Sequence, residues 1–383
     1  MKIKLKNALV FQPPKEHLER VDITVENGYI AKLGPTPDNT VDRTIDLSGK
    51  IIAPPLIDIH THVYHLATSL GVKPNPVSRT TGVDILVDAG SAGAGNFKGF
   101  REYIIKKSEC KVLAFLNISF GGIPFFGIKN GAIQVGEIPK MSAADVEECV
   151  HCGRINRKYI VGIKVRVSLN ANGELGVEPV IAAKRCSKKL GVPLMVHFGA
   201  NPPLLKDILP HLEKGDILTH AFRPEPNSIL QDSETLKAVM HARDKGVILD
   251  VGHGSGSFSF STAINAFELG LYPDIISTDL HAYNINGPVF DLPTTMTKLL
   301  SLGMTLEQVL AAVTTKPSAA LNLRQLSSIE EGKPVRLVIL ELKRGRFVLK
   351  DSMGITRVTK WFIAPFATFK NGELKLLNYN IPV

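Results

Sequence analysis

The feature of this sequence that most limits its fold is a series of eight apolar, strand-like runs separated by helical stretches. Strands that alternate with helices are typical of βα units in a parallel sheet, and eight such units close a (β/α)8 barrel. An open doubly wound sheet can be built from similar runs, so the count alone does not decide between the two. The runs occupy residues 51–60, 82–90, 111–119, 160–168, 193–199, 216–222, 247–254 and 274–281.

Polar residues within these runs favour the barrel, because catalytic side chains of a parallel barrel project from the C-terminal ends of its strands. The first run ends in His60 and His62, whose imidazoles share a face since strand side chains alternate with a period of two. The fourth run contains Lys164 among apolar residues, where an unpaired ammonium is costly to bury. The fifth, sixth and eighth runs supply His197, His220 and Asp279.

Each of these residues alone has an ordinary structural explanation. A single histidine at a strand end is more often hydrogen-bonded than metal-bound, and a buried lysine or aspartate can be half of an ion pair. Four histidines, one lysine and one aspartate at the same end of five strands are a combination that chance does not readily produce. We therefore predict that all six bind metal. Zinc suits such ligands, although manganese, iron or cobalt could occupy them.

Three further residues are candidates for substrate contacts. Arg166 follows Lys164 by two residues and so shares its face of the strand. We predict that Arg166 contacts the substrate, with a structural ion pair at the barrel mouth as the alternative. His253 and His281 also lie at strand ends, where each could bind substrate or hydrogen-bond a metal ligand.

The two ends of the chain have a different sequence pattern, which predicts short strands and turns instead of βα units. Asn27-Gly28 and Asn371-Gly372 are hairpin signals within them. We expect both ends to build one small β-sandwich beside the barrel, because chain termini often meet at a surface. The predicted division is residues 1–52 and 326–383 for the sandwich and residues 53–325 for the barrel.

Charge and composition limit the classes of partner that we expect for this protein. The formal charge is +9, but lysines and arginines are scattered and form no basic run with interleaved aromatics, so we expect no nucleic-acid partner. No apolar stretch approaches ~18 residues and the start of the chain lacks a signal-peptide pattern, so we expect no membrane association. Four cysteines are too few for a disulfide framework and favour the cytoplasm. A small-molecule substrate and a homo-oligomer are the partners we expect.

The order of these motifs closely resembles the amidohydrolase superfamily, and the resemblance covers nearly the whole chain. Residues 50–62, KIIAPPLIDIHTH, match its opening motif, with Pro55 where the family usually has glycine, at a turn that does not touch the ligands. The segments DAGSAGAGNFKGF, GIKVRVS, GDILTHAF, DVGHGSGSFSF and STDLHAYNINGPVF resemble one branch of predicted deacetylases. That branch is often labelled dihydroorotase-like or adenine-deaminase-like, and includes enzymes that cleave acetyl esters of α-hydroxy acids such as acetyl-mandelate.

The resemblance implies a site with two divalent metals. His60, His62 and Asp279 would bind one metal, and His197 and His220 the other. Lys164, carboxylated by CO₂, would bridge both. A water between the metals would supply hydroxide near neutral pH, and Asp279 would take up its proton and pass it to the leaving group.

We therefore expect hydrolysis of a small acyl ester or amide of a carboxylate-bearing substrate. The alternatives are a cyclic-amide hydrolase of the dihydroorotase or hydantoinase type, then an adenine-type deaminase, then a metal-binding barrel without activity.

Overall fold

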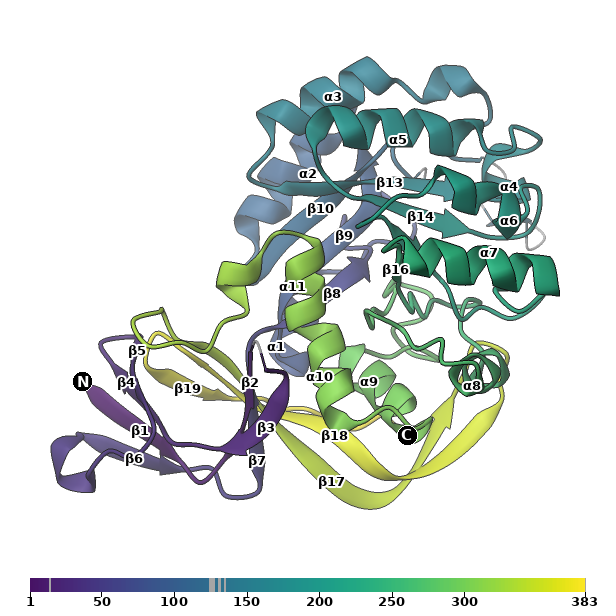
Figure 1. The fold of residues 1–383 in the computed structure, drawn as a ribbon. Helices are drawn as coiled ribbons and strands as arrows, with labels where there is room; N and C mark the ends of the chain where they lie inside the picture. The colour runs from purple at the N-terminus through teal and green to yellow at the C-terminus, as the bar shows by residue number, and fades with distance from the viewer. Residues whose placement is uncertain (14, 124–127, 130–131, 134–135, 383) are drawn as a thin grey trace.

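The computed structural model describes residues 1–13, 15–123, 128–129, 132–133 and 136–382. Its centre is a curled parallel sheet of seven strands in the order β8-β9-β10-β13-β14-β15-β16, with helices around it (Figure 1). Every neighbouring pair in this sheet is parallel. The strands are β8 (Leu56–Thr61), β9 (Val83–Gly93), β10 (Lys111–Asn117), β13 (Ile160–Val167), β14 (Leu194–Phe198), β15 (Ile217–Thr219) and β16 (Ile248–Leu249).

The eighth predicted run closes the barrel without forming a regular strand, which corrects the expectation of eight strands. Residues 274–281 make two isolated parallel bridges, one between Asp250 and Ile275 and one between Thr61 and Leu280. Regular pairing stops between the bridges because Asp279 has φ 51°, a left-handed backbone outside the angles of a regular strand. The segment still lies between β16 and β8, so the (β/α)8 class is confirmed.

Helices cover the outside of the barrel with their apolar faces. In α5, the buried residues Ala183, Cys186 and Leu190 recur at helical spacing, and Gly191 ends the helix in the left-handed region that favours glycine. No helix in the described part of the chain is both long and apolar enough to cross a membrane. The helices are α1 (Pro74–Thr81), α2 (Phe97–Tyr103), α3 (Val146–Ile155), α4 (Leu169–Asn172), α5 (Glu178–Leu190), α6 (Leu205–Ile208), α7 (Ser233–Asp244), α8 (Phe260–Glu268), α9 (Leu292–Ser301), α10 (Leu306–Val313) and α11 (Thr315–Ala320).

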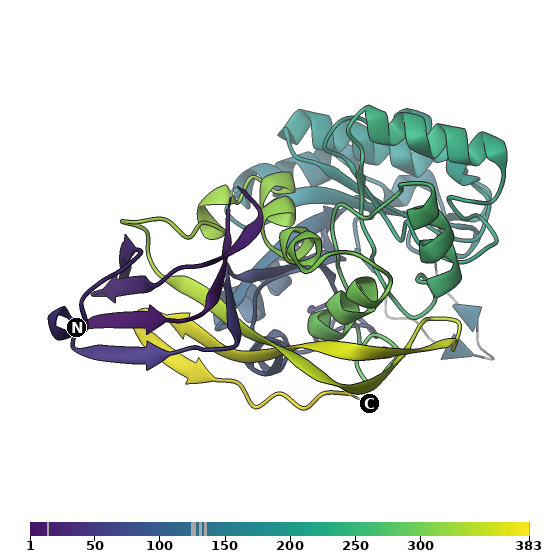
Figure 2. The ribbon, with the colours of Figure 1, turned by 60° about the horizontal axis from the view of Figure 1, so that its bottom comes forward.

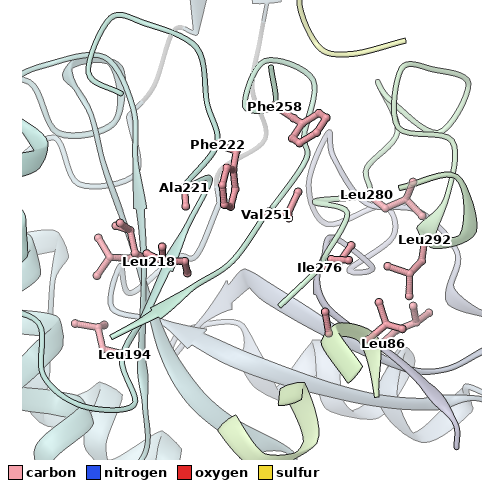
Figure 3. Close-up of a cluster of buried hydrophobic side chains, with 14 of the residues drawn as sticks. Leu86, Leu194, Leu218, Ala221, Phe222, Val251, Phe258, Ile276, Leu280 and Leu292 are labelled. Carbon is pink, nitrogen blue, oxygen red and sulfur yellow. The ribbon is translucent and has the colours of Figure 1, made fainter. Parts of the chain in front are cut away.

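Alternation along the barrel strands separates two hydrophobic cores. Met195 and Ile217 belong to a cluster inside the barrel. Their chain neighbours Leu194 and Leu218 belong to the larger cluster beneath the helices (Figure 3). Because side chains alternate between the faces of a strand, a polar residue two positions beyond an inward apolar residue also points inward. His197 follows Met195 in this way.

Strands from both ends of the chain form the predicted sandwich (Figure 2). A four-stranded sheet has the order β5-β4-β1-β6, and a six-stranded sheet has the order β19-β18-β17-β7-β2-β3. Ile3 and Val25 of the first sheet share a core with Val10, Ile339 and Phe369 of the second.

These strands are β1 (Lys2–Lys6), β2 (Leu9–Gln12), β3 (His17–Arg20), β4 (Ile23–Glu26), β5 (Tyr29–Leu33), β6 (Arg43–Asp46), β7 (Lys50–Ala53), β17 (Arg336–Lys350), β18 (Thr356–Lys370) and β19 (Glu373–Leu376), and a separate pair is β11 (Ile128–Lys129) with β12 (Ala132–Ile133).

Local turn chemistry and long-range ion pairs shape the β-rich part. Asn27 and Gly28 connect β4 to β5, and Asn371 and Gly372 connect β18 to β19, all four with positive φ. These are the backbone angles for which Asn-Gly is favoured in hairpins. Asp84, at the start of β9, is buried and pairs with Arg336 and Lys370. This contact connects the barrel to the sandwich.

Candidate metal centre

The six predicted metal ligands lie together at the C-terminal end of the barrel. Five of them line one cavity of about 620 Å³, and His220 is fully buried behind them. The ring of His220 is 5.0 Å from that of His60 and 4.3 Å from that of His197, centroid to centroid. The residues in the cavity wall are His60, His62, Lys164, His197 and Asp279.

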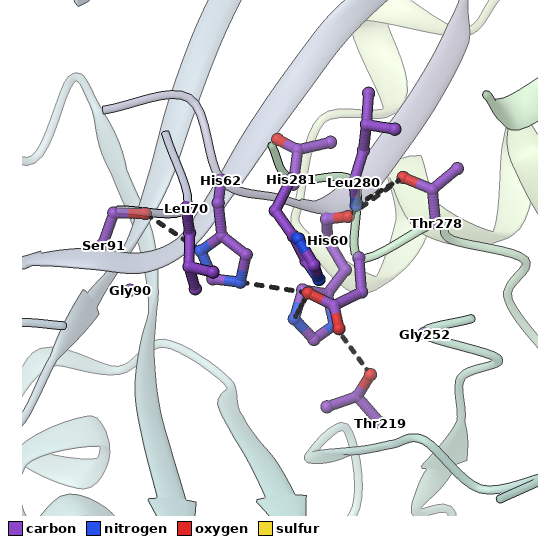
Figure 4. A network of polar contacts seen from close by, with 12 residues as sticks. His60, His62, Leu70, Gly90, Ser91, Thr219, Gly252, Thr278, Leu280 and His281 are labelled. Atoms are coloured by element: carbon purple, nitrogen blue, oxygen red, sulfur yellow. Dashed lines mark hydrogen bonds and ion pairs between the residues drawn. The ribbon is translucent and has the colours of Figure 1, made fainter. Parts of the chain in front are cut away.

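The carboxylate of Asp279 lies close to the imidazoles of His60 and His62. Its Oδ1 lies 3.3 Å from His60 Nε2 and 3.0 Å from His62 Nε2. The ligand atoms of these three residues all lie within 4.8 Å of one another. Lys164 Nζ is 3.1 Å from His60 Nε2. Figure 4 shows His60 and His62 with His281 beside them.

Partners at Nδ1 turn the Nε2 atoms toward the cavity. His220 Nδ1 is 2.6 Å from the carbonyl oxygen of Gly252, which can only accept, so Nδ1 carries the proton and Nε2 a lone pair. Thr219 gives its hydroxyl proton to Asp250 and therefore accepts from Nδ1 of His60, at 2.8 Å. Both imidazoles are held in the tautomer that binds a metal through Nε2.

His62 is oriented in a similar way. Its Nδ1 is 2.9 Å from Ser91 Oγ (Figure 4). Ser91 lies in the C-terminal part of β9, and sequence reasoning missed it, together with Thr219 and Asp250. Nothing in the sequence pattern sets these three residues apart, and only the folded barrel brings them to the histidines.

Two of the six residues have strained backbones. His220 has φ 67° and Asp279 has φ 51°, values that are uncommon for residues other than glycine. Such conformations persist only where the surrounding structure imposes them, and they cluster at functional sites. The strain therefore points to the same place as the side-chain chemistry.

Burial sets the protonation states. Burial lowers the pKa of His60 well below 6.5 and that of His220 to about 4, so both are neutral at pH 7. Burial also lowers the pKa of Lys164 to about 8, against the opposing effect of Asp279 and Glu137.

The donor set fits divalent metal ions. Neutral imidazoles and a carboxylate are the ligands that zinc and related metals prefer. Nε2 of His220 is buried and has no hydrogen-bond partner among the described residues. A buried polar atom without a partner is costly, and a metal at Nε2 would remove that cost.

Arg166 lines the cavity, as a substrate contact should, but it also has an ion-pair partner that sequence reasoning missed. Its Nη1 donates to Glu137 Oε1 at 2.9 Å and its Nη2 to Asn170 Oδ1 at 3.2 Å. Glu137 is itself held by Asn117 Nδ2, at 3.1 Å. Glu137 lies outside the eight runs, in a region without a strand pattern, so the sequence offered no signal for it.

The remaining two candidates for substrate contacts, His281 and His253, lie in different places. His281 lines the cavity, with Nε2 3.2 Å from Ser255 Oγ, and burial lowers its pKa to about 4. His253 is fully buried, and its Nε2 lies 2.9 Å from Lys298 Nζ. Among the described residues, His253 is not part of the cavity wall. The structure therefore brings His281 to the site, whereas the ring of His253 lies beside Lys298 of α9.

Comparisons with known proteins agree with this geometry. The model of the amidohydrolase family matches residues 165–374. A protein of Brucella anthropi named deacetylase is 38% identical over 90% of this chain and 86% of its own length. A deacetylase of Enterococcus faecalis is 33% identical over 92% of this chain and 95% of its own length.

Solved structures match the fold over nearly the whole chain. A crystal structure described as a dihydroorotase has a TM-score of 0.90 and 34% identity, covering 100% of this chain and 99% of the other. One described as an adenine deaminase has a TM-score of 0.87 and 31% identity, covering 98% and 99%. The resemblance seen in the motifs is confirmed, and the chain is a hydrolase that belongs to the amidohydrolase family.

Proposed function

We propose that this hydrolase uses two divalent metals to remove a small acyl group from an ester or amide of a carboxylate-bearing substrate. The observation that carries the proposal is the convergence of four imidazoles, Lys164 and Asp279 on one end of the barrel. The names of the relatives support the reaction, because proteins called deacetylase are 33% and 38% identical over most of both chains.

Two groups of residues would hold the metals. His60, His62 and Asp279 form one set, and His197 and His220 form the other. Lys164 would join the sets after its amine adds to CO₂ and loses a proton, giving a carbamate with two oxygen donors. Burial lowers the pKa of Lys164 from 10.5 to about 8. At pH 7, a larger fraction of this amine is therefore neutral than for a lysine with the ordinary pKa, and the neutral amine is the form that adds to CO₂. When bound, metals of this kind polarise a carbonyl group and lower the pKa of water, and zinc suits these ligands.

Asp279 and Arg166 are the side chains that would transfer protons and donate hydrogen bonds during the reaction. Asp279 Oδ1 faces two imidazoles, which leaves Oδ2 to take up a proton from water and deliver it to the leaving alcohol or amine. Arg166 retains N–H donors beyond those that it gives to Glu137 and Asn170. It can donate to the acyl oxygen as negative charge develops there.

A cyclic-amide hydrolase is the second candidate, because the structure with 34% identity is described as a dihydroorotase. An adenine-type deaminase is the third, since the structure with 31% identity is described as an adenine deaminase. A lysine shared between two metals suits the two hydrolases, whereas deaminases of this kind generally use one metal. A barrel that binds metal without turnover would show no hydrolysis with any of these substrate classes.

Metal analysis of the purified protein beside Lys164→Ala tests the proposal. We expect about two metals per chain in the wild type, a carboxyl adduct in the intact mass under mild conditions, and a sharp loss of metal in the variant. Lys298→Met is the matched control, because it removes another buried ammonium that is not part of the cavity wall. One metal per chain that is retained in Lys164→Ala would refute the two-metal site and favour deamination.

A substrate panel then separates the reactions. Acyl esters and amides, dihydroorotate, hydantoins and adenine represent the competing classes. Hydrolysis of acyl esters or amides by the metal-loaded wild type would support deacylation. Turnover of only a cyclic amide or only adenine would replace it with the corresponding alternative.

A further inference from the structure

The cavity wall contains two arginines with different surroundings. Arg166 lies on β13, in register with His197 on the neighbouring β14. Arg223 lies three residues after His220, in the turn that follows β15, the next strand. The two guanidinium groups therefore come from the strands on either side of the one that carries His197, and both line the same cavity.

The charge of Arg166 is already neutralised. Glu137 Oε1 accepts from its Nη1 at 2.9 Å, and the Glu137 side chain is only 1% exposed. An anion that bound to Arg166 would compete with Glu137 and would leave this buried carboxylate without its counter-ion, which is costly. This arrangement suits a neutral oxygen that becomes charged during the reaction better than a permanently charged group.

Arg223 has no such partner. Its Nη1 donates to the carbonyl oxygens of Pro226 and Asn227, at 3.2 and 3.3 Å. Nε is buried without a hydrogen-bond partner in the described part of the chain, and Nη2 donates to none of the described residues. No carboxylate among the described residues forms an ion pair with Arg223, and the residues outside the described ranges include no aspartate or glutamate.

Arg223 is also held in place. Its guanidinium carbon lies 5.6 Å from the centroid of the Phe198 ring, a distance at which a cation and an aromatic face attract. Burial lowers its pKa, although an arginine stays charged at neutral pH. A fixed cation with a free edge is the arrangement that binds a carboxylate through two parallel hydrogen bonds.

The two carboxylates that line the described part of the cavity face groups other than Arg223. Asp279 faces His60 and His62, and Glu137 faces Arg166. The carboxylates that line the cavity are thus already paired, whereas Arg223 is not. A ligand with a carboxylate would give Arg223 its counter-ion and supply acceptors for its unpartnered donors.

We propose that Arg223 binds the carboxylate of the substrate and determines the preference for acidic substrates, while Arg166 donates to the acyl oxygen. This inference rests on the proposed deacylation, and it names the residue that selects the substrate class.

Arg223→Met tests the inference, because methionine keeps an unbranched apolar side chain and removes the charge. The substrates are acetyl esters of glycolate, lactate and a phenyl-substituted α-hydroxy acid, each beside its neutral carboxamide. We expect kcat/KM for the carboxylates to fall about 10- to 100-fold, mainly through KM, with little change for the carboxamides. Arg223→Lys should recover only part of the loss, since an ammonium lacks the planar fork.

Arg166→Met is the comparison variant, and it should lower kcat for both members of each pair. Equal losses for carboxylate and carboxamide in Arg223→Met, or no loss for either, would overturn the assignment.

Calorimetric binding of the non-reacting 2-methoxy carboxylates and their carboxamides separates this inference from the proposed function. If the wild type cleaves none of these acetyl esters, the proposed deacylation is wrong. Binding of the 2-methoxy carboxylates that weakens 10- to 100-fold in Arg223→Met would still support the role of Arg223. Equal carboxylate affinity in the two proteins, or no carboxylate binding by the wild type, would refute it.

Discussion

Gly254→Ala is expected to disable the site while leaving the fold intact. The backbone of Gly254 has φ +55°, and a Cβ built on it would lie 2.5 Å from Asp279 Oδ2. Ordinary contact begins at 3.4 Å, so the carboxylate or the turn would have to move by about 0.9 Å. A catalytic group that is misplaced by about 1 Å can lose about 100-fold in rate. We therefore expect kcat/KM to fall about 100-fold.

The backbone cost of this substitution can be measured separately. An alanine with left-handed angles costs about 1–2 kcal/mol relative to glycine. Gly191 has φ +63° and nothing within 4 Å of a built Cβ, so Gly191→Ala carries the backbone cost without the clash. Both variants should lose about 1–2 kcal/mol of unfolding free energy in urea.

Only Gly254→Ala should lose activity and metal. The assay compares ester hydrolysis and metals per chain in the wild type and both variants, after their folding has been checked by circular dichroism. If the folded Gly254→Ala protein retains the activity and metal content of Gly191→Ala, then the close approach to Asp279 does not matter for the site, and the reasoning is wrong.

Three further predictions concern the surroundings of the site. Thr219→Val should weaken metal binding about 10- to 100-fold in competition with a chelator, because His60 loses its acceptor at Nδ1; unchanged affinity would contradict this. Burial lowers the folded pKa of Lys298 from 10.5 to about 7, so between these pH values the unfolded chain binds one more proton and the unfolding free energy rises with pH, by up to about 1.4 kcal/mol per unit. Lys298→Met should flatten that rise in urea titrations from pH 7 to 10, and an unchanged slope would show that Lys298 is not its source. Asp84→Asn should cost about 1–2 kcal/mol of unfolding free energy without changing metal content, because Arg336 and Lys370 lose their partner but remain about one-third exposed; a loss of metal would mean that the contact also shapes the site.

The sequence was sufficient for the features that depend on short-range patterns. Strand alternation predicts that Lys164 and Arg166 face the same way, and both line the cavity. Asn-Gly pairs predict the two hairpins at Gly28 and Gly372, because few other residues accept these backbone angles. The roles of the six predicted metal ligands remain predictions, although the structure brings their side chains together.

The tertiary structure decided what depends on contacts between distant residues. Glu137 reaches Arg166 from a segment without a strand pattern, and of the two arginines in the cavity wall only Arg223 has no carboxylate partner among the described residues. His253 and His281 have equivalent positions in the sequence pattern, but only His281 reaches the cavity. Periodicity fixes which face of a strand a residue occupies, because it follows from local backbone geometry. Which charges meet is decided only by how the loops pack, because those contacts join residues far apart in the chain.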